Sequence, residues 1–461
     1  YLPAILEAQY SGVPLIVLSA DRPYTLLHTG APQTVDQQKI FGTAVNYYEE
    51  LSVPQDEHYY TYPRQVARKA YMKAIDTKKG PVHINIPLFE PLVPELDRKH
   101  FEAGRSPYKV FKPNYGDVFS YQNRSNNTSN ASNVSDVSDV SYTKNTTDNS
   151  ANNTNNFNNS NLLLTQYKRV LILAGPQIDI DEVESIHSFA ENLQAPILAD
   201  PLSNVRRCHK TGTIDDNHEV ASNRNNDTDM IQKKHFSDVV ISTYDAFLAD
   251  KDLWPVLKPD CVIQFGQIVV SKRVQQMVAS WDNVEYIEVN PTMDSMNPMG
   301  KTTIHMQASI DMFTHLFAVK NESNAYLNRW QRLEVAGKAQ LSTAIEEPSC
   351  FEGRTIRELQ QHIPDNSQVL VANSMTVRDF DYFWLSGESD AVLYGNRGVN
   401  GIDGTVSTAL GLATNHQPTY LVTGDLSLFH DLNGLAVAKT HNLNLTIILH
   451  NNDGGGIFEY L

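Results

Sequence analysis

The sequence has few cysteines, no long hydrophobic segment and fewer basic than acidic residues. Its three cysteines, Cys208, Cys261 and Cys350, form no CxxC pair, so reduced intracellular thiols are a simpler interpretation than a disulfide framework. No apolar run approaches the roughly 18 residues of a membrane-spanning helix. The 53 acidic and 37 basic residues give a net charge of −16, which argues against nucleic acid or a membrane surface as a partner. We therefore expect a cytoplasmic protein.

Short apolar runs alternate with helical patterns along most of the 461 residues, as is typical of α/β domains with buried parallel strands. Apolar residues make up 41% of the chain, enough for several cores. We expect three doubly wound parallel-sheet domains, at residues 1–105, 165–335 and 350–461. The predicted strands are 13–18, 82–87, 170–175, 196–200, 262–266, 284–289, 369–372, 391–394, 420–423 and 445–449.

The segment between the first two domains, residues 106–164, has a different composition. Residues 122–161 are almost entirely Asn, Ser, Thr and Asp. Such a segment cannot bury enough apolar surface to order itself, so we expect a linker with a disordered insertion. Residues 218–234 are a second polar stretch, which we interpret as a loop inserted into the central domain.

Polar residues follow the last two predicted strands at the point where each strand ends. Gly424-Asp425 follows the strand 420–423, and Asn452, with Gly454 to Gly456 close behind it, follows the strand 445–449. Carboxylate and amide oxygens suit Mg²⁺, and glycines allow the backbone to approach a diphosphate closely. The alternative is an ordinary pair of α/β turns, in which Asp425 caps a helix and the Asn-Gly run makes a turn.

Two more polar loops follow the strands 369–372 and 391–394. The first loop runs from Asn373 to Arg378, and the second, from Gly395 to Gly404, has four glycines and opens a helix at Thr405. Glycine-rich turns before helix N-termini bind anions, although each loop alone is also compatible with a plain turn. Because consecutive strand ends meet at one sheet edge, we predict that these loops form one composite pocket.

Five sequence segments together resemble one family of thiamine diphosphate enzymes. They are SADRPYTLLHTGAPQTVDQ (19–37), SKR (271–273), NSMTVRD (373–379), GNRGVNGIDGTVSTALG (395–411), and GDLSLFHDLNGL (424–435) with NNDGGGIF (451–458). The chain resembles the 2-succinyl-5-enolpyruvyl-6-hydroxy-3-cyclohexene-1-carboxylate synthases of menaquinone biosynthesis, and the arginine-bearing loop 395–404 distinguishes them from other thiamine enzymes.

The resemblance implies a transferase with pyrimidine-binding, central and diphosphate-binding domains. It implies thiamine diphosphate with Mg²⁺ (or Mn²⁺), decarboxylation of 2-oxoglutarate, and transfer of the succinyl carbanion equivalent to isochorismate. It also implies a homodimer or homotetramer with the active site between subunits. Both substrates carry two carboxylates, which guanidinium and ammonium groups bind through charge-assisted hydrogen bonds.

The resemblance also assigns site residues. The metal ligands are Asp425, Asn452 and the carbonyl of Gly454, while the side chain of Asp453 is spare. The other cofactor-binding residues are Ile402, Gly424, Leu426, Ser427, Gly455, Ile457 and Phe458. The substrate-binding residues are Arg22, Gln33, Lys272, Arg273, Ser374, Arg378 and Arg397. Ile402, which props the bent cofactor, Arg397 and Gln33 form the catalytic set. Taken alone, Arg22, Gln33 and the Lys272-Arg273 pair are more typical of ordinary surface positions than of a site.

Two alternatives remain open at the level of sequence. An acetolactate synthase-like carboligase would share Asp425 and Asn452 but would not need five basic side chains. A degenerate binding or scaffold protein would keep the fold without catalysis. The segment that carries the family's activating glutamate has no match downstream of Tyr1. We therefore expect a fragment truncated at both ends and inactive by itself, from an active parent enzyme.

Overall fold

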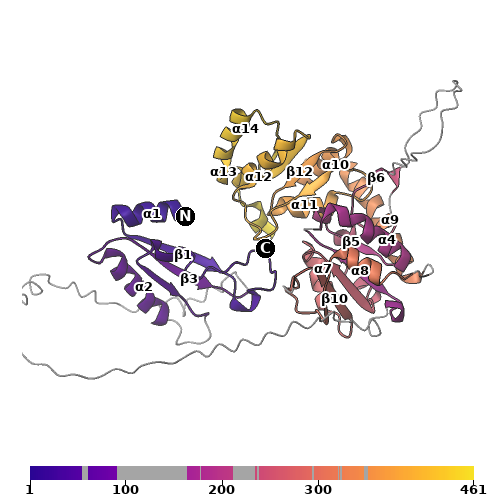
Figure 1. Cartoon of the computed structure of the whole chain (residues 1–461), viewed down its shortest axis with the longest axis horizontal. Helices are drawn as coiled ribbons and strands as arrows, with labels where there is room; N and C mark the ends of the chain where they lie inside the picture. Colours follow the sequence, from indigo (N-terminus) through magenta and orange to yellow (C-terminus); the bar gives the residue numbers. More distant parts are fainter. Residues whose placement is uncertain are drawn as a thin grey trace, which may run out of the picture.

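The computed structural model describes residues 1–53, 61–90, 164–176, 178–210, 234–235, 238–292, 295–319, 321, 324–346 and 351–460. Three parallel sheets, of three, six and four strands, follow one another along the chain (Figure 1). They lie within the predicted ranges 1–105, 165–335 and 350–461, whose limits stay predictions. The Asn-rich tract 122–161 and residues 218–233 of the polar stretch lie outside the described residues.

The N-terminal sheet has the strand order β1-β3-β2. Its core lies between the sheet and α2, where Val82 and Ile84 of β3 contact Val66, Ala70 and Ala74 of the helix. The elements are α1 (Leu2–Ser11), β1 (Leu15–Asp21), β2 (Tyr47–Glu50), α2 (Thr61–Ile75) and β3 (Pro81–Pro87), with 3₁₀ turns at Tyr24–Leu26 and Gly42–Ala44. The strand β1 is at an edge, and its Ile16 and Leu18 side chains are exposed.

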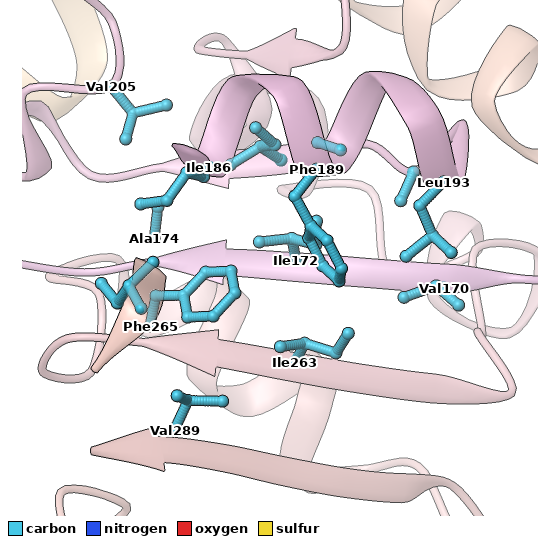
Figure 2. Packing of buried hydrophobic residues seen from close by; sticks show 14 of the residues in the cluster. Val170, Ile172, Ala174, Ile186, Phe189, Leu193, Val205, Ile263, Phe265 and Val289 are labelled. Atoms are coloured by element: carbon cyan, nitrogen blue, oxygen red, sulfur yellow. The ribbon is translucent and has the colours of Figure 1, made fainter. Parts of the chain in front are cut away.

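The middle sheet has the order β11-β10-β9-β4-β5-β8, and both of its faces are buried. Along β4, Ile172 belongs to the core on one face (Figure 2), whereas Leu171 and Leu173 belong to the core on the other. This confirms the expected double winding. The strands are β4 (Val170–Ala174), β5 (Ile197–Ala199), β8 (Val240–Ile241), β9 (Cys261–Phe265), β10 (Glu285–Asn290) and β11 (Ile304–Gln307). The helices are α4 (Val183–Leu193), α5 (Tyr244–Phe247), α6 (Leu253–Val256), α7 (Lys272–Ala279) and α8 (Ile310–Leu316).

Smaller elements and one long helix complete this part of the chain. The two-residue strands β6 (His209–Lys210) and β7 (Lys234–His235) pair antiparallel. The helix α9 (Ala325–Glu346) leads toward the last sheet, and its Glu334 carboxylate accepts hydrogen bonds from the backbone N–H groups of Ser242 and Thr243.

The C-terminal sheet has the order β13-β12-β14-β15, with all pairs parallel. Val369 and Val371 pack on one face and Leu370 on the other, so this sheet is also covered on both sides. Its strands are β12 (Gln368–Val371), β13 (Val392–Tyr394), β14 (Thr419–Gly424) and β15 (Thr446–His450). Its helices are α10 (Glu352–His362), α11 (Met375–Phe383), α12 (Thr405–Leu412), α13 (Asp425–His430) and α14 (Leu435–His441).

The segment after Asp425 differs from its sequence pattern. Leu428, Leu432, Leu435 and Ala436 recur at helical spacing there, which predicts one helix with these residues on one side. The structure has α13 and α14, separated by a 3₁₀ turn over Leu432–Gly434. At the break, the Asp431 carboxylate accepts hydrogen bonds from the backbone N–H and the hydroxyl of Ser407, at 2.6 and 3.0 Å. Leu428 and Leu435 still pack on the core, while Leu432 is exposed.

A buried arginine joins the middle and C-terminal sheets. The Arg206 side chain is 1% exposed and lies 2.7 Å from the Asp381 carboxylate of α11. It also donates hydrogen bonds to the carbonyls of Ala199, Asp381 and Trp384. Because a guanidinium has five N–H donors in a fixed fork, this one group ties β5 to α11. Among the described helices, none has the length and apolar character that crossing a membrane requires.

Candidate functional site

The loops of the predicted pocket share the carboxyl edge of the C-terminal sheet. The four strands are parallel, so the segments after β12, β13, β14 and β15 all emerge at the same edge. These segments begin at Ala372, Gly395, Asp425 and Asn451. In the register of β14 and β15, Gly424 is opposite His450, which places the start of α13 beside the loop that follows β15.

The loop after β15 is shaped by glycines. Gly454 and Gly455 have φ values of 87° and 69°, a backbone region that favours glycine. A Cβ atom on Gly454 would lie 3.5 Å from the Leu426 side chain, so the loop contacts the first turn of α13. A Cβ atom on Gly456 would lie 2.7 Å from Nδ2 of Asn452. Glycine at position 456 therefore leaves the space that the Asn452 amide occupies.

The oxygen donors at this corner fit a hard cation with a diphosphate. Asp425 supplies a carboxylate, one oxygen of which accepts the Leu426 N–H at 2.7 Å. Asn452 supplies an exposed amide and Gly454 a backbone carbonyl. Within the described ranges no group of three or more His, Cys, Asp and Glu side chains could hold a metal. A mixed set of carboxylate, amide and carbonyl oxygens is the chemistry that Mg²⁺ accepts alongside phosphate oxygens.

Asn373 organises the glycine-rich loop after β13. Its Nδ2 donates to the carbonyls of Asn396, at 3.0 Å, and Gly401, at 2.6 Å. Its Oδ1 accepts a hydrogen bond from Nη1 of Arg397 at 2.6 Å. One buried amide therefore fixes two points of the loop and the direction of the Arg397 guanidinium.

A hydroxyl pair joins the same loop to α13. The Thr405 hydroxyl donates to the carbonyl of Ile402 at 2.8 Å, and the Ser427 hydroxyl lies 3.3 Å from that carbonyl and 3.1 Å from the Thr405 oxygen. Thr405 and Ser427 are both buried. The backbone at Ile402 is thus held against the helix that begins at Asp425.

The arginines of the pocket are partly desolvated. Burial lowers the pKa of Arg397, and Asp200 opposes this while Arg378 adds to it. Burial also lowers the pKa of Arg378, whose Nη1 donates to the carbonyl of Ser374. Both guanidiniums remain charged at neutral pH, because an arginine pKa starts so far above it. Partly desolvated cations that lie near each other favour an anionic ligand.

A loop of the middle sheet borders the same site. Asn204 makes two hydrogen bonds with the backbone of Leu393, at 3.1 and 2.9 Å, at the end of β13. A Cβ atom on Gly395 would lie 2.6 Å from the Leu202 side chain. The segment that leads into Arg397 therefore packs directly on the loop after β5.

The basic pair Lys272-Arg273 begins α7, and Ser271 caps that helix by accepting the Val274 N–H at 3.2 Å. Lys272 is exposed. Arg273 forms an ion pair with Asp245 and also donates to its carbonyl at 3.0 Å. Burial raises the pKa of Tyr382 in α11 and the Arg273 guanidinium opposes this, so Arg273 lies near α11.

Arg22 and Gln33 lie in the segment that follows β1 of the N-terminal sheet. Arg22 lines a cavity of about 210 Å³ together with Asp21, Asp36 and Glu50, and it lies 3.7 Å from the Glu90 carboxylate. Gln33 is exposed and has a φ of 56°. In the part of the chain that the structure describes, no hydrogen bond or ion pair joins these two side chains to the C-terminal sheet.

The structure thus gathers most of the predicted residues at one sheet edge. Gly424 ends β14, and the others follow strand ends of the C-terminal sheet: Ser374, Arg378, Arg397, Ile402, Asp425, Leu426, Ser427, Asn452, Gly454, Gly455, Ile457 and Phe458. Sequence reasoning missed Asn373, Thr405, Asp200 and Arg206. A signal existed for Asn373 and Asp200, because both polar residues end or follow predicted strands. None existed for Arg206, whose partners at Asp381 and Trp384 are more than 170 residues away in sequence.

Comparison with known proteins gives two family matches. Residues 228–371 match the family described as "Middle domain of thiamine pyrophosphate", and residues 374–460 match "Thiamine pyrophosphate enzyme, C-terminal TPP binding domain". The second range contains every loop of the C-terminal sheet edge except Asn373 and the residue before it.

Curated relatives match over the whole chain. A 2-succinyl-5-enolpyruvyl-6-hydroxy-3-cyclohexene-1-carboxylate synthase of Lactococcus lactis subsp. cremoris is 42% identical over 100% of this chain and 72% of its own length. Proteins of the same name from Desulfitobacterium hafniense and Bacillus cytotoxicus are 39% and 34% identical, and they are covered over 72% and 70% of their lengths. With this similarity and with the thiamine diphosphate loops at its sheet edge, the chain belongs to the 2-succinyl-5-enolpyruvyl-6-hydroxy-3-cyclohexene-1-carboxylate synthase family.

Proposed function

We propose that this protein acts in menaquinone biosynthesis by decarboxylating 2-oxoglutarate and transferring the succinyl unit to isochorismate. The product is 2-succinyl-5-enolpyruvyl-6-hydroxy-3-cyclohexene-1-carboxylate. The observation that carries the proposal is the Arg397 guanidinium, which Asn373 directs from within the cofactor-binding edge. An arginine so placed can bind a substrate carboxylate beside the reacting centre.

We further propose the cofactor contacts. Asp425, Asn452 and the Gly454 carbonyl hold Mg²⁺ or Mn²⁺ on the diphosphate, and the backbones of Gly424, Leu426, Ser427 and Gly455 line the same corner. Ile402, Ile457 and Phe458 supply the apolar contacts. Thiamine diphosphate supplies the electron sink that decarboxylation of a 2-oxo acid requires. The contribution of the protein is to orient the cofactor and to exclude water around it.

The substrates are bound, in this proposal, by the basic residues. Arg378 and Arg397 receive carboxylates at the C-terminal sheet edge, with Ser374 as a polar partner. Lys272 and Arg273 approach from the middle sheet, and Arg22 and Gln33 from the N-terminal body. This local group of cations offsets the acidic field of a chain with a net charge of −16.

We also propose a homodimer or homotetramer in which a second copy completes the active site. Arg22 and Gln33 lie on a different body from the cofactor-binding edge, so another subunit is a reasonable source for them. Large apolar side chains are exposed on both bodies, among them Leu18, Tyr24, Phe429 and Phe458. Sedimentation equilibrium tests the assembly, and a monomer at micromolar concentration would argue against it. The cytoplasmic location stays a prediction.

The reaction is tested with the enzyme that contains this sequence, supplied with thiamine diphosphate and Mg²⁺. We expect CO₂ release from 2-oxoglutarate that depends on isochorismate. Arg397→Ala should weaken use of both substrates far more than cofactor affinity, whereas Arg169→Ala, in an exposed ion pair with Asp260, should change neither. Pyruvate acting as the donor, with no use of 2-oxoglutarate, would favour an acetolactate synthase. No saturable thiamine diphosphate binding would favour a scaffold protein.

A further inference from the structure

A fully buried carboxylate lies between the two sheets that border the site. Asp200 follows β5 and has no exposed surface. Burial raises the pKa of its carboxyl, and the N–H groups of Val270 and Leu202 and the cations Arg397 and Arg206 oppose this. A buried carboxyl group is costly for folding, so its presence in such a place calls for a reason other than stability.

One oxygen of Asp200 shapes the segment that supports Arg397. Oδ1 accepts the Leu202 N–H at 2.9 Å, which fixes the turn after β5. That turn presents Leu202 to Gly395 and Asn204 to the backbone of Leu393. The strand end two to four residues before Arg397 thus rests on a turn that Asp200 holds.

The other oxygen holds the segment that carries the second basic group. Oδ2 accepts the Val270 N–H at 2.8 Å. Val270 directly precedes Ser271, the cap of α7, and then Lys272 and Arg273. The two oxygens of one carboxyl group therefore fix two backbone segments, and each segment leads to a basic part of the pocket.

We propose that Asp200 is a positioning residue for substrate binding: it sets Lys272 and Arg273, on the middle sheet, in register with Arg397 on the C-terminal sheet. The inference rests on the proposed function, because it assumes that these cations bind the carboxylates of the substrates. Asp200 touches neither substrate nor cofactor in this role. It acts through the N–H groups of Leu202 and Val270.

The test is Asp200→Asn, which keeps the shape but replaces one accepting oxygen by an NH₂ group that cannot accept. The matched control is Asp260→Asn. Asp260 also accepts two backbone N–H groups, from Lys168 at 3.2 Å and Arg169 at 3.0 Å, but it precedes β9 at the opposite edge of the same sheet. Calorimetric affinity for 2-oxoglutarate, KM for both substrates, thiamine diphosphate affinity and Tm are measured for each protein.

We expect Asp200→Asn to weaken 2-oxoglutarate binding and to raise both KM values about tenfold or more, which is the effect of losing one strong hydrogen bond. Thiamine diphosphate affinity should change less than about twofold. Asp260→Asn should leave all three unchanged. Equal losses of substrate and cofactor binding in Asp200→Asn would show a merely structural role and overturn the inference. Unchanged substrate binding would overturn it as well.

A second variant covers the case in which Asp200→Asn does not fold. Asn204→Ala leaves Asp200 intact and removes the two hydrogen bonds to Leu393. We expect it to raise KM in the same direction, and unchanged KM values would contradict the inference. A wild-type enzyme that binds thiamine diphosphate but neither binds nor uses 2-oxoglutarate would instead overturn the proposed function itself. The two failures are therefore distinguishable.

Discussion

Replacing Asn373 by alanine tests how Arg397 is directed. Asn373 is only 4% exposed, so water does not replace the hydrogen bonds that its removal breaks. Three hydrogen bonds are lost: those to the carbonyls of Asn396 and Gly401, and the one received from Arg397 at 2.6 Å. The guanidinium is then free to turn away from the position in which the loop now holds it.

The expected magnitude follows from the hydrogen bond to the charged group. Such a bond contributes about 1.5–3 kcal/mol. At about 1.4 kcal/mol for each factor of ten, kcat/KM for isochorismate and 2-oxoglutarate should fall roughly 10- to 150-fold. Asn373→Asp keeps an acceptor for Arg397 and loses only the donors to the two carbonyls. We therefore expect it to retain a higher kcat/KM for both substrates than Asn373→Ala.

The assay is a double-mutant cycle in kcat/KM. If Asn373 acts through Arg397, Asn373→Ala should cost less than about threefold in an Arg397→Ala background, because the group that it directs has already been removed. An undiminished loss in that background would refute the reasoning. Thiamine diphosphate affinity, measured in parallel, separates this effect from collapse of the glycine-rich loop.

Three further changes test other parts of the structure. Arg206→Ala leaves the Asp381 carboxylate buried without its cation, and we expect urea denaturation to show a loss of about 3–5 kcal/mol, against less than about 1 kcal/mol for Arg169→Ala. Burial raises the pKa of Asp379 from 3.8 to about 7, so between these values the folded protein holds a proton that the unfolded chain has released. As pH rises from about 4 to 7, the free energy of unfolding of the wild type should therefore fall relative to that of Asp379→Asn, by up to about 1.4 kcal/mol per pH unit. Urea denaturation measures it, and the same pH dependence in both proteins would contradict this prediction. Gly456→Ala should displace the Asn452 amide and weaken Mg²⁺-dependent thiamine diphosphate binding with little change in Tm, whereas Gly398→Ala, where a Cβ meets nothing within 4 Å, should leave binding intact.

The sequence predicts the fold well because its strands are short, apolar and closely bounded. The runs that end at Ala372, Tyr394 and Thr423 place their polar loops at one edge once the strands are parallel, so the grouping of these loops follows from the pattern. Helix continuity is less predictable, since Asp431 at the break bonds a tertiary partner, Ser407.

The residues that hold the site together from other parts of the chain were less predictable still. Asp200 bonds a backbone N–H 70 residues away, and Arg206 bonds a carbonyl 178 residues away. No local sequence pattern predicts such distant partners. The sequence predicts which groups bear the chemistry of the site, and the fold shows which residues hold those groups in place.

The hydrogen bonds of the Arg206 guanidinium, called the fork below, also affect how this chain divides into domains. Sheet topology separates the six-stranded and four-stranded sheets, but the fork makes the carbonyls of Asp381 and Trp384 part of the interior beside β5. Pulling the two sheets apart would expose a desolvated charge and its acceptors in a single event. The Arg206 charge and its buried acceptors therefore resist separation of two sheets that the topology draws apart.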